Sequence, residues 1–316
     1  MAGGDAETLG VEVWRGGVNS WETDENAHMN VRFYITRALE GLVGLAGALG
    51  MPRAYSPEAG ATLLLREHHI RFLREAHPGS LLHMRAAVLS IDETEVKVAQ
   101  VLYHSATGEP AATFVSRLGH VTARGGRPFP WSRLTRERAA GLMAQAPDYA
   151  APRGLALDPF ESVASLQRAE ALGVKAIAAG AVMPQDCDAF GRLRAEQFIG
   201  RVSDGIPQLV SHIRRIIAAH APTPIERIGG AVLEYRLVYF DWPRAGDRVT
   251  VHSGLADVGE RTQRLVHWLL DPETGKAWAT STAVAGTMDL DARKLVPIAP
   301  AAQAELKAMA VAGLEL

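Results

Sequence analysis

Residues 21–34 read WETDENAHMNVRFY and lead into the apolar run VRFYITRALEGLVGLAGALG of residues 31–50. Asp24, Asn26 and His28 stand at alternate positions in this stretch. Asp and Asn are poor strand formers, but they are common where helices begin. We therefore expect a polar loop followed by a helix. Apolar residues occupy nearly the whole circumference of that helix, which indicates burial on most sides.

Three glycines, Gly41, Gly44 and Gly47, recur at every third residue of the apolar run. Each glycine costs a helix interior roughly 1 kcal/mol, so their recurrence predicts that a sheet approaches the helix backbone closely. A second long apolar segment covers residues 193–218 and contains Pro207. Proline removes a backbone donor and clashes with the preceding turn, so we expect a kink or a break there.

The chain carries an internal repeat, found by sliding residues 63–122 along residues 230–289 without a gap. Nine identical positions in this alignment are modest by themselves, but the turn sequences also agree: HPGS matches RAGD, and SATGEP matches PETGKA. Between these turns, apolar and polar residues alternate as they do in strands. Each half is therefore expected to form an antiparallel meander of about four strands after its helix.

These features predict an α+β chain with two similar domains. We place the first domain at residues 1–123 and the second at residues 173–290. Residues 124–172, rich in Arg, Ala and Pro, are expected to connect them, and residues 291–316 to form a C-terminal tail.

The composition excludes several classes of function. The 316 residues carry a formal net charge of −2, whereas nucleic-acid binding needs a Lys/Arg excess on one face. The one cysteine, Cys187, fits a reducing compartment, and the absence of a secretory signal or a membrane-spanning run predicts a cytoplasmic protein. No phosphate-binding glycine motif is present. His77 and His83 flank a turn without a Cys or acidic cluster at ligand spacing, so we predict no metal site and no cofactor.

The segment TDENAHMNVRFYITRALE resembles the helix start of hot-dog thioesterases of the 4-hydroxybenzoyl-CoA and acyl-ACP type. Those families carry an Asp before the helix, a His-x-Asn at its start, then an aromatic residue and often an acidic one. The matching residues here are Asp24, His28, Asn30, Tyr34 and Glu40, and Asn26 adds the Asp-x-Asn-x-His form of acyl-ACP thioesterases. The resemblance implies tandem hot-dog domains, each with a long central helix wrapped by a curled antiparallel sheet.

A second, degenerate copy of this motif reads DCDAFGRLRAEQFIGRVSDG, at an offset of 164 residues. It keeps an acidic residue at two places, with Asp188 matching Asp24 and Asp204 matching Glu40. Arg192, however, stands in place of His28. In the plant-type acyl-ACP enzymes the fuller motif lies in the C-terminal half, whereas here it lies in the N-terminal half.

Thioester hydrolysis requires a polarised carbonyl and an activated water or a carboxylate nucleophile. The helix N-terminus can polarise the carbonyl, with Asn26 or His28 as extra donors. Asp24 or Glu40 can act as general base or attack directly to form an anhydride, and His28 can donate or shuttle a proton. We therefore predict the catalytic residues Asp24, Asn26, His28 and Glu40, and the substrate-binding residues Asn30, Tyr34, Asp188 and Asp204.

The leading interpretation is an acyl-thioester hydrolase that acts on acyl-CoA. The alternatives are an acyl-ACP thioesterase acting on a carrier-protein thioester and a non-catalytic hot-dog protein that binds acyl ligands. A hydratase on the same fold also pairs Asp with His, but its wider spacing is absent here. The sequence leaves the acyl chain and the formation of a homo-oligomer open.

Overall fold

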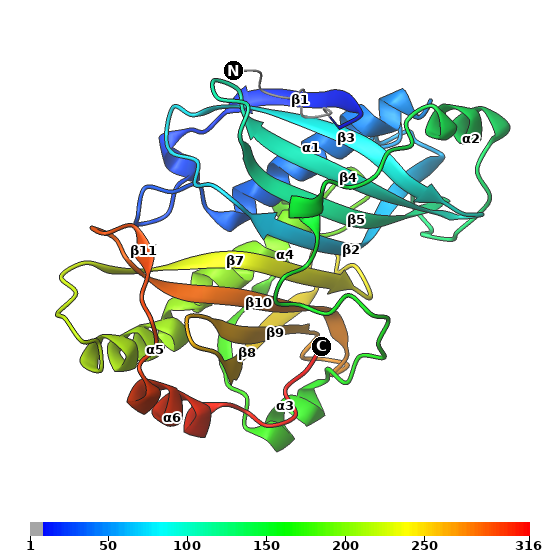
Figure 1. The fold of residues 1–316 in the computed structure, drawn as a ribbon. Coiled ribbons are helices and arrows are strands. Elements are labelled where there is room, and N and C mark those ends of the chain that lie inside the picture. The colour runs from blue at the N-terminus through cyan, green and yellow to red at the C-terminus, as the bar shows by residue number, and fades with distance from the viewer. Residues whose placement is uncertain (1–8) are drawn as a thin grey trace. The chain divides into compact units, whose positions relative to one another are not determined.

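The computed structural model describes residues 9–316, and the chain divides into two compact units between Ala151 and Pro152 (Figure 1). Each unit contains an antiparallel sheet and the long apolar segment predicted to be helical. The prediction of two repeated domains built on antiparallel sheet is thereby confirmed, while the residue limits given above for the domains stay a prediction. Within the described residues, no helix is both long enough and apolar enough to cross a membrane.

Unit 1 contains a five-stranded sheet with the strand order β1-β3-β4-β5-β2. The helix α1 packs against β1 and β3 of this sheet. The elements of unit 1 are β1 (Val11–Gly17), η1 (Ser20–Glu22), α1 (Val31–Ala48), β2 (Ala61–Phe72), β3 (Leu81–Ile91), β4 (Glu95–His104), β5 (Pro110–Thr122), α2 (Arg133–Ala140) and η2 (Asp148–Ala150).

Unit 2 repeats this plan with the strand order β7-β10-β9-β8-β6, and a short strand, β11, pairs with β10. The predicted break at Pro207 is confirmed, because one helix ends at Gly205 and the next begins at Pro207. The elements of unit 2 are α3 (Leu166–Leu172), β6 (Ala176–Ala181), η3 (Pro184–Asp186), α4 (Ala195–Gly205), α5 (Pro207–Ala219), β7 (Ile228–Tyr239), β8 (Arg248–Val258), β9 (Gln263–Leu270), β10 (Ala277–Asp289), β11 (Lys294–Leu295) and α6 (Pro300–Met309).

The strand pairing differs from the predicted four-strand meander at one connection in each unit. In unit 1, β3, β4 and β5 form consecutive hairpins, but β2 pairs with β5 and not with β3. The sequence HPGS does contain a turn, with Gly79 at φ +83°. Residues 73–80, however, form a longer connection that leaves β2 beside β5, where Leu73 N donates to Ala111 O at 2.8 Å. The chain then passes β5 and β4, and β3 begins on the other side of these two strands in the sheet.

The close approach of a sheet to the α1 backbone is confirmed at two of the three glycines. A Cβ on Gly41 would lie 2.6 Å from Gln100 Nε2, and a Cβ on Gly44 would lie 2.3 Å from the carbonyl oxygen of Val13 in β1. At Gly47 the prediction is wrong, because a Cβ there would meet no atom within 4 Å. Glycine is therefore required by packing at Gly44, where the neighbour is backbone that cannot rotate away.

Each unit buries one histidine against a serine of a neighbouring strand. His68 Nδ1 lies 2.7 Å from Ser116 Oγ in unit 1, and His267 Nδ1 lies 2.8 Å from Ser253 Oγ in unit 2. Both rings are almost fully buried. Burial disfavours the charged imidazolium and lowers the pKa of His68 and of His267 to about 3. Both histidines are therefore neutral in the folded protein at ordinary pH.

These two histidines are expected to make the protein acid-sensitive below pH 6.5. The unfolded chain takes up a proton near pH 6.5, whereas the folded chain resists it down to about pH 3, so the stabilisation is complete above pH 6.5 and is lost as the pH falls. At pH 5.0 each histidine should have cost about 2 kcal/mol of unfolding free energy. Urea unfolding of wild type and His267→Gln at pH 7.5 and pH 5.0 measures this loss. Gln is the residue at the equivalent position of unit 1, Gln100. An equal loss in wild type and variant would contradict the assignment to His267.

Candidate active site

The loop before α1 is organised by Asp24. Asp24 Oδ1 accepts hydrogen bonds from the backbone amides of Asn26 at 2.9 Å and His28 at 3.1 Å. The backbone amide of Asp24 donates in return to the carbonyl oxygen of His28 at 2.8 Å. Ala27 adopts the left-handed conformation at φ +58°, which non-glycine residues seldom occupy. One carboxylate oxygen of Asp24 thus fixes the tight turn that presents Asn26 and His28.

Unit 2 builds the same loop around Asp188. Asp188 Oδ1 accepts from the amides of Phe190 at 2.8 Å and Arg192 at 2.9 Å, and Gly191 takes the left-handed position of Ala27 at φ +76°. Asp188 Oδ2 accepts from the Arg192 side chain at 3.0 Å. The structural role of the Asp is therefore common to both units. The side chain at the second amide differs, because unit 1 has His28 at the position of Arg192.

The loop delivers the chain to the N-terminus of α1. Asn30 is the N-cap residue, and its Oδ1 accepts the amide of Arg32 at 2.9 Å. Aligned peptide dipoles place partial positive charge at this helix end, where backbone amides can stabilise an oxyanion. The Asn30 side chain is thus engaged in capping, and its predicted contact with substrate stays a prediction.

Tyr34 lies one turn into α1 and is almost fully buried, with 4% of its surface exposed. Its ring packs edge-to-face on Phe72 at 5.1 Å between centroids, and its hydroxyl is hydrogen-bonded to the backbone of Ala76. Burial, opposed by that hydrogen bond and reinforced by the charge of Asp24, raises the pKa of Tyr34 far above its ordinary value. Tyr34 is therefore a neutral, protonated residue that joins α1 to the connection after β2.

The connection between β2 and β3 meets the loop before α1 at several points. Met29 N donates to Ala76 O at 2.8 Å, which anchors the two segments through their backbones. His28 Nδ1 then lies 3.5 Å from a carboxylate oxygen of Glu75, and the other oxygen of Glu75 lies 3.8 Å from His77 Nε2. The His28 side chain is largely buried, with 13% exposed, and Glu75 is half-buried.

Sequence reasoning missed Glu75 and set His77 aside for want of an acidic neighbour. Glu75 stands only two residues before His77, so that signal was present in the sequence. The proximity of both residues to His28 depends on the crossing of the β2–β3 connection. If a tight turn had joined β2 directly to β3, Glu75 would have remained beside these strands and away from the loop before α1.

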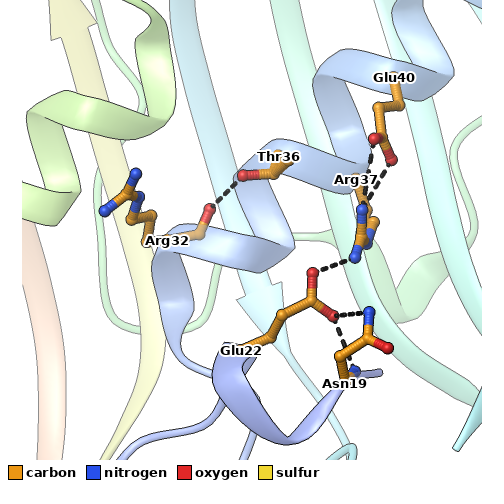
Figure 2. Close-up of polar contacts among 6 residues, drawn as sticks. All are labelled: Asn19, Glu22, Arg32, Thr36, Arg37 and Glu40. Atoms are coloured by element: carbon orange, nitrogen blue, oxygen red, sulfur yellow. Dashed lines mark hydrogen bonds and ion pairs between the residues drawn. The ribbon is translucent and has the colours of Figure 1, made fainter. Parts of the chain in front are cut away.

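Glu40 belongs to a different polar cluster on α1, shown in Figure 2. Glu22 is buried and forms an ion pair with Arg37, and Arg37 also pairs with Glu40 at 3.0 Å. The Glu40 side chain is 44% exposed. Glu40 follows the first residue of α1, Val31, by nine positions, which corresponds to about 13 Å along the helix axis.

The structure therefore does not bring Glu40 to the helix N-terminus with Asp24, Asn26 and His28. Unit 2 has a counterpart of the Glu22–Arg37 pair, because Arg201 Nη2 lies 3.5 Å from Asp186 Oδ2. This recurrence indicates a structural ion pair that ties each helix to the short 3₁₀ helix before it. Asp204, the counterpart of Glu40, is exposed near the end of α4, far along the helix from Asp188.

A family model described as the thioesterase-like superfamily matches the chain twice, at residues 18–139 and 182–306. The chain belongs to this superfamily, and the predicted resemblance to hot-dog thioesterases is confirmed. The two matches fall on the two units and include the loop before α1 and its counterpart in unit 2.

Two curated relatives carry betainyl-CoA thioesterase in their names. The L-carnitine dehydrogenase/betainyl-CoA thioesterase of Rhizobium meliloti (strain 1021) is 32% identical over 113 residues, which are 36% of this chain and 23% of that protein. The betainyl-CoA thioesterase of Pseudomonas aeruginosa is 25% identical over 119 residues, covering 38% of this chain and 75% of that protein. The chain thus spans less than a quarter of the Rhizobium protein.

Solved structures of similar fold align with most of the chain. The acyl-ACP thioesterase of Bacteroides thetaiotaomicron superposes with a TM-score of 0.62 at 12% identity, covering 86% of this chain and 96% of that one. The 12:0-ACP thioesterase of Umbellularia californica gives a TM-score of 0.63 at 11% identity, covering 87% and 93%. Identities this low establish the fold alone.

Proposed function

We propose that the protein hydrolyses acyl-CoA thioesters at the N-terminus of α1 in unit 1. The observation that carries this proposal is the His28–Glu75 pair, 3.5 Å apart, on the loop that leads to this helix end. The equivalent positions of unit 2 hold Arg192 and Trp242, which cannot form such an acid–base pair. The names of the curated relatives support CoA as the carrier of the acyl group.

The proposed reaction uses His28 as general base and acid. Its Nδ1 faces the Glu75 carboxylate, so Nδ1 carries the proton and Nε2 the lone pair. Nε2 takes a proton from water as the water oxygen attacks the thioester carbon. The α1 amides and Asn26 stabilise the oxyanion. When the carbon–sulfur bond breaks, His28 returns the proton to the leaving thiolate.

The remaining predicted residues position or stabilise the reacting groups but do not transfer protons themselves. Asp24 fixes the loop through Oδ1, and its charge stabilises the imidazolium that forms on His28, as Asp188 holds the guanidinium of Arg192. We infer that α1 is the central helix of its hot-dog unit and that Tyr34 anchors it to the β2–β3 connection. Glu75, and not Glu40, is the carboxylate of this mechanism, and it orients His28 through Nδ1 while His28 serves as the base.

Thiol release from acyl-CoA substrates tests the proposal directly. The panel contains betainyl-CoA and short, long and aromatic acyl-CoAs. It is assayed with otherwise wild-type protein and with Asp24→Asn, both in a Cys187→Ser background, so that the protein has no thiol to react with the reagent. We expect hydrolysis by wild type and a loss of about 100-fold in Asp24→Asn. Asn retains an oxygen at Oδ1, so the loop should persist and the loss should report the missing charge. Failure to hydrolyse any acyl-CoA, with hydrolysis of acyl-carrier-protein thioesters, would overturn the choice of CoA.

A further inference from the structure

We propose that His28, Glu75 and His77 bind a divalent transition-metal ion of the Zn²⁺ type, and that this ion inhibits hydrolysis. The binding claim is independent of the proposed function, whereas the inhibition rests on it. The three side chains come from two segments far apart in the sequence. One ligand atom from each lies within 4.8 Å of the others, in the only such group of His, Cys, Asp and Glu side chains among residues 9–316.

The distances within this group suit a zinc ion. His28 Nδ1 lies 3.5 Å from one oxygen of Glu75, and His77 Nε2 lies 3.8 Å from the other. In a tetrahedral zinc site with ligand bonds near 2.1 Å, neighbouring ligand atoms are about 3.4 Å apart. Small side-chain rotations therefore close the group around an ion. Two histidines and one glutamate are an established donor set for zinc, and the fourth position remains for water.

The orientation of His77 favours metal binding. Its Nδ1 lies 3.1 Å from the carbonyl oxygen of Ala27, which can only accept a hydrogen bond. Nδ1 therefore carries the proton, and the lone pair lies on Nε2, the nitrogen that faces Glu75. A backbone carbonyl that fixes the tautomer of a histidine is the usual outer support of a metal ligand. The left-handed Ala27 supplies this carbonyl from the loop before α1.

Unit 2 shows that the loops can join without these three side chains. There, Leu193 N donates to Pro243 O at 2.7 Å, the counterpart of the 2.8 Å bond from Met29 to Ala76 in unit 1. The equivalents of His28, Glu75 and His77 are Arg192, Trp242 and Arg244. Arg244 still donates to a loop carbonyl, that of Phe190, at 3.1 Å. The two loops can therefore be joined without His28, Glu75 and His77, so joining them is not the reason why unit 1 carries these three side chains.

Metal binding and catalysis require opposite tautomers of His28. Catalysis requires the Nδ1 proton to face Glu75, which leaves the Nε2 lone pair for water. Coordination through Nδ1 moves the proton to Nε2, so His28 can no longer accept one. The ion also binds the Glu75 carboxylate, which can then no longer orient His28. Occupancy should consequently stop hydrolysis without unfolding the loop, which would make the enzyme sensitive to free zinc.

Titration of tag-free protein, stripped with a chelator and desalted, tests the binding claim. We expect calorimetry with Zn²⁺ to show one strong site per chain, and Co²⁺ to give the intense visible absorption of a tetrahedral site. His77→Asn keeps an amide donor for the Ala27 carbonyl but removes Nε2, and should weaken Zn²⁺ at least about 10-fold. His220→Asn is the matched control, because His220 faces a single carboxylate, Glu305, at 3.2 Å.

Activity measurements separate the inhibition from the binding. Zn²⁺ should abolish acyl-CoA hydrolysis by wild type, whereas His77→Asn should keep its metal-free rate within about twofold and resist the same Zn²⁺ concentration. Absence of a strong Zn²⁺ site, or equal affinity in His77→Asn, would overturn the metal site. Binding with unaltered hydrolysis would overturn the inhibition. A protein that binds Zn²⁺ through His77 but hydrolyses no thioester would support the metal site and refute the proposed function.

Discussion

Substituting His28 by Ala, or Glu75 by Gln, should lower kcat for acyl-CoA hydrolysis by about 100-fold or more. His28→Ala removes the group that takes and returns the proton. Glu75→Gln keeps the size of the side chain but removes the charge that lies 3.5 Å from His28 Nδ1. Because the two residues act as a unit, the double variant should be only slightly slower than either single variant. KM should change little, since neither side chain is proposed to bind the acyl group or CoA.

Steady-state kinetics with the best substrate of the panel measures this effect, with circular dichroism to confirm folding. The matched control is Arg192→Ala, which alters the equivalent position of unit 2 and removes an ion pair with Asp188. We expect its kcat to stay within about threefold of wild type, because unit 2 has no counterpart of the His28–Glu75 pair. Near-wild-type kcat in His28→Ala and Glu75→Gln would place the reaction elsewhere in the chain.

Gly44→Ala and Gly47→Ala should change stability in opposite directions, although both replace glycine by alanine on α1. At Gly44 the new methyl group would lie 2.3 Å from the carbonyl oxygen of Val13, so β1 must move away from the helix. Overpacking of this kind should cost about 3 kcal/mol. At Gly47 the methyl group meets nothing within 4 Å, and the better helix propensity of alanine should add about 0.5–1 kcal/mol.

Urea unfolding monitored by tryptophan fluorescence and by circular dichroism compares the two variants with wild type. Trp14 lies in β1, the strand that Gly44→Ala would displace, so its signal reports the local change. Equal stability of Gly44→Ala and wild type would show that β1 is not held against α1 as described. A loss of stability in Gly47→Ala would show that its surroundings are tighter than they are in the structure.

The sequence predicted those features that depend on local chemistry or on the repeat. The polar loop before α1, the helix itself and the break at Pro207 all follow from residue preferences that act over a few positions. Close packing at Gly41 and Gly44 follows from the cost of glycine in a helix. The two units could be predicted because equivalent turn sequences recur at a constant spacing.

The proximity of Glu75 to His28 was missed because it depends on which strands become neighbours. HPGS has the composition of a tight turn whether it closes a hairpin or ends a longer crossing, so the position of Glu75 could not be read from it. Glu40 was assigned to the site because it matches an acidic residue of the hot-dog thioesterase motif, but its side chain is 44% exposed and pairs with Arg37. Along the axis of α1, Glu40 lies about 13 Å from the helix N-terminus.

The loops built around Asp24 and Asp188 have a consequence for how the two copies could diverge. In each loop, one carboxylate oxygen accepts the same two backbone amides, and the path of the chain is the same whether the side chain at this position is that of His28 or that of Arg192. The conformation of the loop and its reactivity thus depend on different residues, Asp24 for the first and His28 for the second. After a duplication, one copy could lose its reactive side chain by drift while retaining a foldable loop, and selection for activity needed to preserve only the other.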